Sequence, residues 1–136
     1  MLSEREIKLA LLPAAVFLLG TGLLAMVAPD TFFDDIGKYG VENSHYVGDV
    51  GAFQLAAGVG VLVAMLQPSW RPPILWVGFV WFELHALNHL FDIGEARSDA
   101  RGWFDTILLA LAGAASAYLA VASERLRRSE GEVESL

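Results

Sequence analysis

Long runs of apolar residues, separated by short polar segments, dominate the pattern along this chain. There are four such runs, over residues 9–28, about 46–66, 74–91 and about 103–122. Each is close to the ~20 residues that an α-helix needs to cross the hydrocarbon core of a bilayer. The pattern therefore predicts an all-α integral membrane protein, built as a four-helix bundle.

Composition agrees with this prediction, since 55% of the 136 residues are hydrophobic and only 18% are charged. The chain has no cysteine, which excludes disulfides, thiolate metal ligands and thiol nucleophiles. Its net charge of -7 argues against nucleic acid as a partner, because nucleic-acid binding needs a basic surface. The lipid bilayer is the partner that the sequence itself predicts.

The basic residues predict the orientation. With four spans, both termini lie on one side of the membrane. That side carries six of the nine Lys and Arg residues, namely Arg5, Lys8, Arg71, Arg125, Arg127 and Arg128. The other side carries Lys38, Arg97 and Arg101. The positive-inside rule then predicts cytoplasmic termini. Residues 1–123 form the spanning domain, and residues 124–136 are expected to be a charged, disordered cytoplasmic tail.

The connections between spans also carry signals. Prolines at 68, 72 and 73 predict a tight turn that makes spans two and three antiparallel neighbours. In the first outer loop, Asp30 can cap a short interfacial helix bearing Phe32, Phe33, Ile36 and Tyr39 at helical spacing. Asn43 or Ser44 can cap span two, and Ser98 or Asp99 can cap span four.

Small residues predict how the helices pack, because helices in lipid associate through close backbone approach. Span two has a small-residue ladder of Ala52, Ala56, Gly60 and Ala64. Span four has a similar set, Ala110, Gly113, Ala114 and Ala117. A compact bundle is expected from these two surfaces.

Ionisable residues near the outer ends of spans two, three and four are the candidate site, because such residues are rare in spans and suggest function. The candidate metal ligands are His45, Asp49, His85, His89, Asp92 and Asp105. On span three, His85, Asn88, His89 and Asp92 share one helix face by their spacing. We expect an outward-facing pocket where these faces converge.

Neutral imidazole and carboxylate are ligands for zinc, iron or manganese, so a divalent metal is the first candidate cofactor. Haem held by two histidines, a quinone headgroup and a proton relay are alternatives that use the same residues. Deeper in the bilayer, Glu83 and Gln54 lie at similar levels and can form a separate pair, and with Asn88 they are candidate cofactor-binding residues. A structural role is the competing interpretation, because Asp49 and Asp105 fall in first helical turns, which favour carboxylates.

Two segments resemble a known family. Residues 17–24 (FLLGTGLL), with Ala28 and Pro29 after them, and residues 51–62 (GAFQLAAGVGVL) are similar to the first two spans of the DoxX-like superfamily of small four-helix membrane proteins. The resemblance implies a bacterial inner membrane location and an association with quinone-linked redox or thiosulfate chemistry, and it does not extend to the histidine motifs at 43–45 and 85–89. Many members have a glutamate in the second span where this chain has Gln54, so no role is carried over to that position.

Three function classes follow from these observations. The first is a membrane protein whose His/Asp pocket binds a metal or redox cofactor, with no reaction or catalytic residue assigned. The second is a non-catalytic accessory subunit of a larger membrane complex, or a homo-oligomer. The third is a proton-coupled carrier in which Glu83 and Gln54 extend the outer cluster toward the middle of the membrane.

Overall fold

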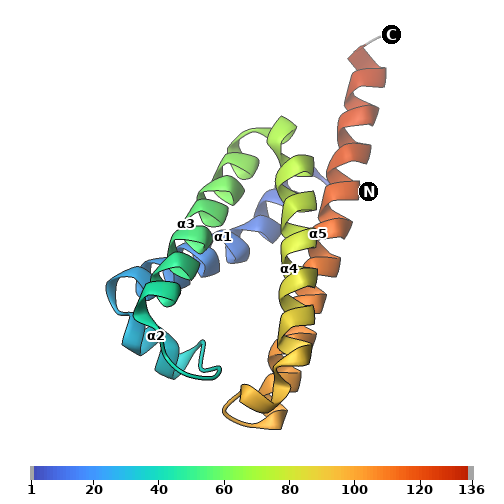
Figure 1. The fold of residues 1–136 in the computed structure, drawn as a ribbon. Helices are drawn as coiled ribbons and strands as arrows, with labels where there is room; N and C mark the ends of the chain where they lie inside the picture. Colours follow the sequence, from blue (N-terminus) through green and yellow to red (C-terminus); the bar gives the residue numbers. More distant parts are fainter. Residues whose placement is uncertain (1, 135–136) are drawn as a thin grey trace.

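The computed structural model describes residues 2–134, and all of its regular elements are helical apart from one isolated bridge between Tyr39 and Ala96. Four helices are long and apolar enough to cross a membrane, as predicted. The elements are α1 (Glu4–Val27), α2 (Pro29–Asp35), α3 (Ser44–Leu66), the 3₁₀ turn η1 (Pro68–Trp70), α4 (Arg71–Phe91), the 3₁₀ turn η2 (Ile93–Glu95) and α5 (Asp99–Glu134) (Figure 1).

Local capping explains where the long helices begin. Ser3 and Glu6 form a reciprocal capping box at the start of α1. The side chain of Asn43 accepts hydrogen bonds from the backbone N–H groups of His45 and Tyr46, which caps α3. Ser98 Oγ accepts a hydrogen bond from the backbone N–H of Arg101 at 3.3 Å, which caps the start of α5. The predicted caps of spans two and four are therefore confirmed.

The short helix of the first loop is also confirmed, although it starts and ends earlier than expected. Pro29 occupies its first turn and no side chain caps it, so Asp30 does not have the predicted capping role. Phe32 and Phe33 are buried. Tyr39 lies beyond the end of α2, in extended chain that leads toward α3.

The long helices pack as two pairs. The chain termini and the α3–α4 turn lie at one end of the molecule, called here the terminal end, and α2 and the α4–α5 connection lie at the other, the loop end (Figure 1). α1 packs along α3 and α4 packs along α5, while α3 and α4 share only a limited contact. The predicted turn is present and α3 and α4 are neighbours, but the main packing partner of each is another helix, because the turn that joins two helices does not decide which faces pack.

Glycine contacts explain the close α1–α3 pair. A Cβ atom on Gly22 would lie 2.9 Å from the carbonyl oxygen of Gly51, and a Cβ on Gly51 would lie 2.9 Å from that of Gly22. The buried stripe of α3 runs through Gly51, Gln54, Gly58, Val61 and Ala64. Ala52 and Ala56 of the predicted ladder are exposed instead. Ala64 is buried as the ladder predicted and Gly60 lies against Ile74 of α4, so the prediction is wrong only for Ala52 and Ala56, because α3 carries small residues on more than one face.

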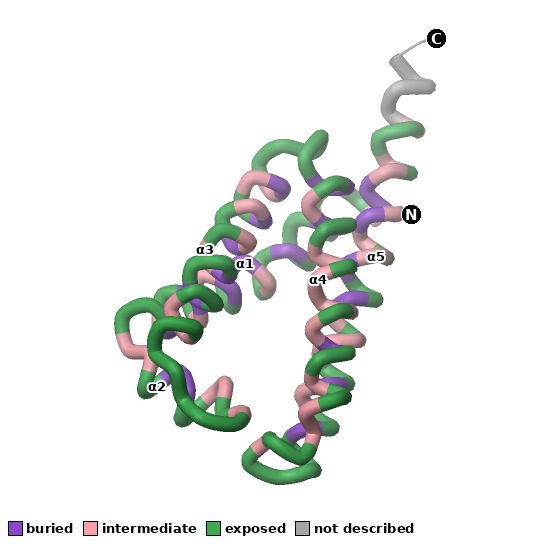
Figure 2. Tube along the Cα trace, in the orientation of Figure 1, coloured by how far each residue is buried: buried purple, intermediate pink, exposed green. Residues whose placement is uncertain are grey.

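The core lies mainly where the two pairs meet. Its buried members are Ile7, Leu11, Ala15, Leu18, Val61, Ala64, Leu75 and Ala120. Many large apolar side chains point outward along the four long helices, and Figure 2 shows extensive exposed surface on them. An apolar exterior of this extent is what a bilayer solvates.

One buried ion pair ties the two helix pairs together at the terminal end. The side chain of Arg71 is only 1% exposed, and its guanidinium donates to both carboxylate oxygens of Glu4. It also donates to the carbonyl oxygens of Ala64 at 2.8 Å and Met65 at 3.3 Å, near the end of α3. Arg71 thus satisfies late carbonyls of one helix while it anchors the first turn of another.

The final helix is longer than predicted. α5 continues to Glu134, so residues 124–134 are helical rather than disordered, and residues 135 and 136 lie outside the described part. Glu124 contributes by accepting a hydrogen bond from Trp76 Nε1 at 2.9 Å. The sequence Glu124-Arg125-Leu126-Arg127-Arg128 consists of residues with high helix propensity, with Glu124 four residues before Arg128, and both features favour continuation of the helix.

Candidate functional site

Two histidines one turn apart on α4 form the centre of the candidate site. The Nε2 atoms of His85 and His89 lie 3.1 Å apart, which is hydrogen-bonding distance. The Nδ1 atoms of both rings are buried and have no hydrogen-bond partner in the protein. Buried polar atoms without partners are uncommon in folded proteins, and each one calls for an explanation.

The bonding pattern of this pair, called here the His dyad, follows from imidazole chemistry. In a neutral pair, one ring must donate from Nε2–H and therefore has a bare Nδ1, which is an acceptor. The other ring accepts at Nε2 and therefore carries Nδ1–H, which is a donor. Whichever histidine donates, the dyad offers one buried acceptor and one buried donor to a bound molecule.

Aromatic rings flank the His dyad on both sides. Toward the middle of α4, the ring of Trp81 lies 5.8 Å from that of His85 and 5.2 Å from that of Phe53 on α3. Toward the loop end, the Tyr39 ring packs edge-on against His89 with ring centroids 4.3 Å apart. The dyad therefore lies in a column of rings contributed by α3, α4 and the loop after α2.

The segment that carries Tyr39, residues 34–40, crosses from the α1–α3 side of the molecule to the α4–α5 connection, and we call it the strap. Gly40 N donates to Glu95 O at 3.2 Å, with Gly40 at a φ of +59°, a left-handed conformation that glycine adopts without strain. Arg97 donates to the carbonyl oxygen of Asp34. The Tyr39 hydroxyl donates to Asp105 Oδ2 at 3.3 Å, and Arg101 Nε donates to the same oxygen at 2.8 Å.

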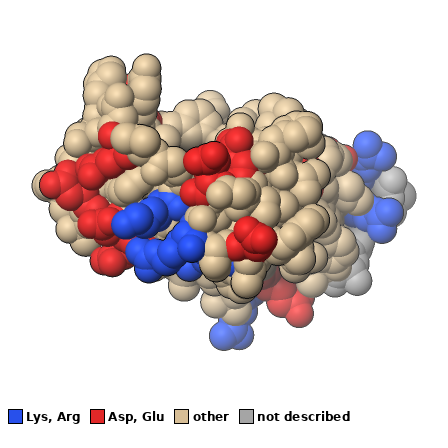
Figure 3. Space-filling model, turned by 60° about the horizontal axis from the view of Figure 1, so that its bottom comes forward, with Lys and Arg blue, Asp and Glu red and all other residues tan. Residues whose placement is uncertain are grey.

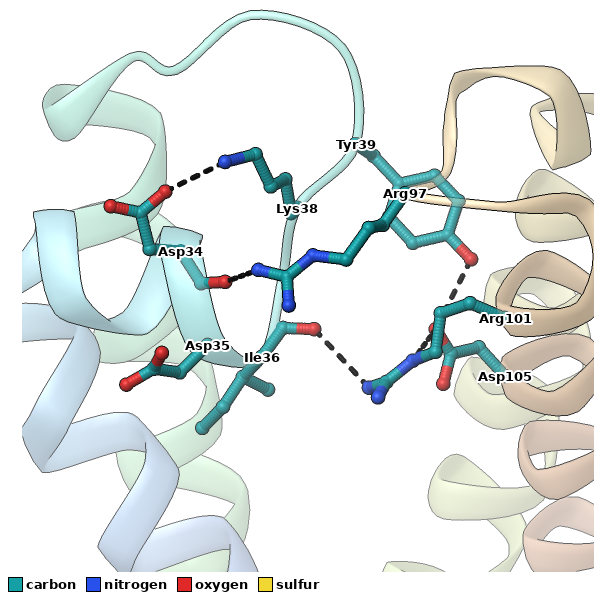
Figure 4. A pocket seen from close by; sticks show the side chains of 8 residues that line it. All are labelled: Asp34, Asp35, Ile36, Lys38, Tyr39, Arg97, Arg101 and Asp105. Carbon is teal, nitrogen blue, oxygen red and sulfur yellow. Dashed lines mark hydrogen bonds and ion pairs between the residues drawn. The ribbon is translucent and has the colours of Figure 1, made fainter.

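A pocket of about 90 Å³ lies beneath these contacts. Figure 4 shows its lining, which comes from the strap on one side and from the residues around the start of α5 on the other. The lining residues are Asp34, Asp35, Ile36, Lys38, Tyr39, Arg97, Arg101 and Asp105. In Figure 3, where the loop end comes forward, basic side chains lie between acidic groups. The strap is thus held mainly by polar contacts.

The other predicted ligands do not join the His dyad. His45 and Asp49 face each other at 3.7 Å on the first turns of α3, with their side chains 79% and 67% exposed. Asp92 accepts a hydrogen bond from Asn88 at 3.3 Å. Within residues 2–134, no three His, Cys, Asp or Glu side chains are placed to hold a metal ion together. Of the six predicted ligands, only His85 and His89 form a direct pair with both rings partly buried.

The deeper pair predicted between Gln54 and Glu83 is also not formed. Gln54 is buried on the face of α3 that meets α1, and its Oε1 atom has no hydrogen-bond partner. Glu83 lies against α5, where its carboxylate occupies the space that a Cβ on Gly113 would need. The two side chains therefore belong to different helix interfaces.

Tyr39 is the residue whose contact with the site the sequence did not predict. It was expected on an interfacial helix, and its actual place depends on how the strap folds over the α4–α5 connection. The only signal in the sequence is the glycine at 40, which permits the sharp change of direction next to it.

The environment of Tyr39 leads to a prediction about pH. Burial, together with the negative charge of Asp105, raises the pKa of Tyr39 from 10.0 to about 12. Because the folded state favours the neutral phenol, the stabilisation from Tyr39 is fully present below pH 10.0 and is lost as the pH rises toward about 12. Tyrosinate absorbance in a Tyr46→Phe/Tyr118→Phe background should show this high titration. Asp105→Asn should shift the midpoint of the Tyr39 titration toward 10. A midpoint near 10 in the protein that keeps Asp105 would contradict the prediction.

Comparison of this chain with protein-family models, with curated proteins and with solved structures gives no match.

Proposed function

We propose that this chain is a small multi-pass membrane protein, with cytoplasmic termini, that binds the headgroup of a lipid-soluble quinone at the His dyad. The observation that carries the proposal is the pair of buried, unpartnered Nδ1 atoms on His85 and His89. Four apolar helices that could span a bilayer support the membrane location. The resemblance of spans one and two to DoxX-like proteins favours a bacterial inner membrane, and quinone-linked chemistry is one of the two chemistries that it implies.

The hydrogen-bonding chemistry of a quinone fits the His dyad in both redox states. The carbonyl oxygen of the oxidised form accepts a hydrogen bond, which the Nδ1–H group can donate. The hydroxyl of the reduced form donates a hydrogen bond, which the bare Nδ1 atom can accept. The neighbouring Trp81 supplies an aromatic face against which a planar ring can stack. Exposed apolar side chains on the same helix, such as Leu87 and Phe91, suit an isoprenoid tail.

A divalent metal at the same residues is the second candidate, because one distance favours it. Two nitrogen ligands of a tetrahedral zinc ion, each ~2.0–2.1 Å from the metal, are about 3.3 Å apart. The observed Nε2–Nε2 distance of 3.1 Å is close to this value. A metal here would need its remaining ligands from water or from a bound molecule, since no third side chain of the described residues completes the set.

Binding of a short-chain benzoquinone to the detergent-solubilised protein tests the proposal, with quenching of tryptophan fluorescence as the readout. We expect His85→Ala and His89→Ala to weaken binding about tenfold each, which corresponds to loss of one buried hydrogen bond. His45→Ala is the matched control, because this exposed histidine lies on another helix and should leave binding unchanged.

Two results would decide against the quinone. Equal affinity of the wild type and all three variants would show that the His dyad does not bind the headgroup. Stoichiometric zinc in the purified wild type, lost in His89→Ala but retained in His45→Ala, would favour the metal instead.

A further inference from the structure

We propose that Tyr39 determines the specificity of the His dyad by closing its loop end against water-soluble molecules, so that only a ligand dissolved in the membrane reaches the imidazoles. This inference deepens the proposed function and rests on it for the identity of the ligand. The closure itself can be tested without any quinone.

Tyr39 lies between the His dyad and the loop end. The Tyr39 ring lies against His89 on the side of the dyad that faces the loop end, with centroids 4.3 Å apart. On the opposite side the dyad meets Trp81, which is apolar surface within the span. Tyr39 is therefore the ring that separates the two imidazoles from the charged pocket at the loop end, whose lining it also shares.

The Tyr39 ring is held in place by its hydroxyl and by its backbone. Its hydroxyl donates to Asp105, and Asp105 is fixed in turn by Arg101 from the preceding turn of α5. The backbone is held by the antiparallel Tyr39–Ala96 bridge, which includes the bond from Gly40 N to Glu95 O. A side chain held at both its backbone and its far end has little freedom to move away from His89.

The Nδ1 atoms of the His dyad are more buried than their place near a helix end would suggest. Both Nδ1 atoms have essentially no contact with solvent, although His89 lies in the last turn of α4 and His85 lies one turn further in. By contrast, His45 lies in the first turn of α3 and its side chain is 79% exposed. His89 and His45 lie at comparable distances from the ends of their helices, and His89 differs in having the Tyr39 ring packed against it.

Histidine modification by the aquapentaammineruthenium(II) cation in detergent tests the closure, because this charged reagent stays in water and binds neutral imidazole nitrogen. The chain has three histidines, so mass spectrometry of peptides can follow each one. In the wild type we expect fast modification of His45 and slow modification of His85 and His89. In Tyr39→Ala, we expect the rate at His89 to rise about tenfold or more, with His45 unchanged.

Tyr39→Phe is the matched control, since it keeps the ring and removes only the hydroxyl. We expect it to keep His89 protected, because the backbone of the strap still holds the ring in place. The proposal is overturned if the wild-type dyad reacts as fast as His45, if Tyr39→Ala leaves its rate unchanged, or if the phenylalanine variant reacts as fast as the alanine variant.

A second variant guards against misfolding of Tyr39→Ala. Lys38 and Arg97 flank the antiparallel bridge between Tyr39 and Ala96, so they oppose each other in its register. Residues opposed in this way have Cα atoms ~4.5–5.5 Å apart, within the range that a disulfide spans. Lys38→Cys/Arg97→Cys therefore introduces one closable link into a chain that has no other cysteine.

The oxidised double variant should protect the dyad at least as well as the wild type, and the reduced form should react faster because two polar contacts of the strap are lost. Equal rates in the two redox forms would overturn a role for the strap. If the histidines are protected as expected but quinone binding fails, the closure stands and the proposed ligand is wrong. If quinone binds but protection does not depend on Tyr39, the proposed function stands and the closure is wrong.

Discussion

Gly22→Ala is expected to lower the free energy of unfolding by about 2 kcal/mol, because the added atoms would force α1 away from α3. Gly22→Leu should lower it further. A Cβ at position 22 would lie 2.8 Å from the backbone nitrogen of Leu55 and 2.9 Å from the carbonyl oxygen of Gly51. These are backbone atoms and cannot rotate aside as a side chain can. Thermal unfolding in detergent, followed by circular dichroism, measures the change.

Gly20→Ala is the matched control on the same helix. No atom lies within 4 Å of a Cβ placed there, apart from the helix's own backbone and adjacent residues. Alanine also favours the helix over glycine by up to about 1 kcal/mol, so this variant should be as stable as the wild type or more stable. If the variants at positions 20 and 22 had equal unfolding temperatures, close α1–α3 packing through Gly22 would be refuted.

Loss of the Glu4 carboxylate should lower the free energy of unfolding at least as much as Gly22→Ala does. Glu4→Ala leaves the guanidinium of Arg71 buried without its counter-ion, and an uncompensated buried charge costs about 3 kcal/mol. The carbonyls of Ala64 and Met65 still accept from Arg71, which keeps the cost near the lower end of the usual range. The same unfolding measurement applies, and Glu4→Gln should recover part of the loss because its amide oxygen still accepts a hydrogen bond.

Lys8→Ala provides the comparison for this ion pair. Lys8 contacts the same carboxylate at 3.3 Å, but its side chain is 45% exposed, so its removal should cost less than about 1 kcal/mol. An equal loss in Glu4→Ala and Lys8→Ala would mean that the buried pair contributes no more than a surface contact.

The spans and their caps were predictable because their signals are local. A run of about 20 apolar residues specifies a span wherever it packs, and Asn43 or Ser98 needs only its next few residues to cap a helix. Helix pairing was not predictable in the same way. Both Gly51 and Ala52 are small, and nothing in α3 itself shows which of the two faces α1. That choice depends on Gly22, which lies in a different helix.

In the candidate site, too, local features were predictable from the sequence and long-range contacts were not. The His85–His89 pair was predictable because residues four apart on a helix are neighbours. The gathering of His45 and Asp49 with them required the ends of α3 and α4 to converge, and spacing within each helix carries no information on that distance. Tyr39 reaches the dyad through a loop whose course is set by contacts with η2 and α5, which spacing also does not encode.

The division into two helix pairs also bears on how the molecule moves. Each pair is closely packed within itself, whereas the pairs share their apolar contacts mainly near the terminal end, next to the turn at Pro68–Trp70. Relative motion that separates their far ends would part the Tyr39–His89 and Phe53–Trp81 ring contacts and break the polar bonds of the strap. The expected motion is a hinge of two rigid bodies about that turn, with amplitude limited by how long the polar bonds at the opposite end persist.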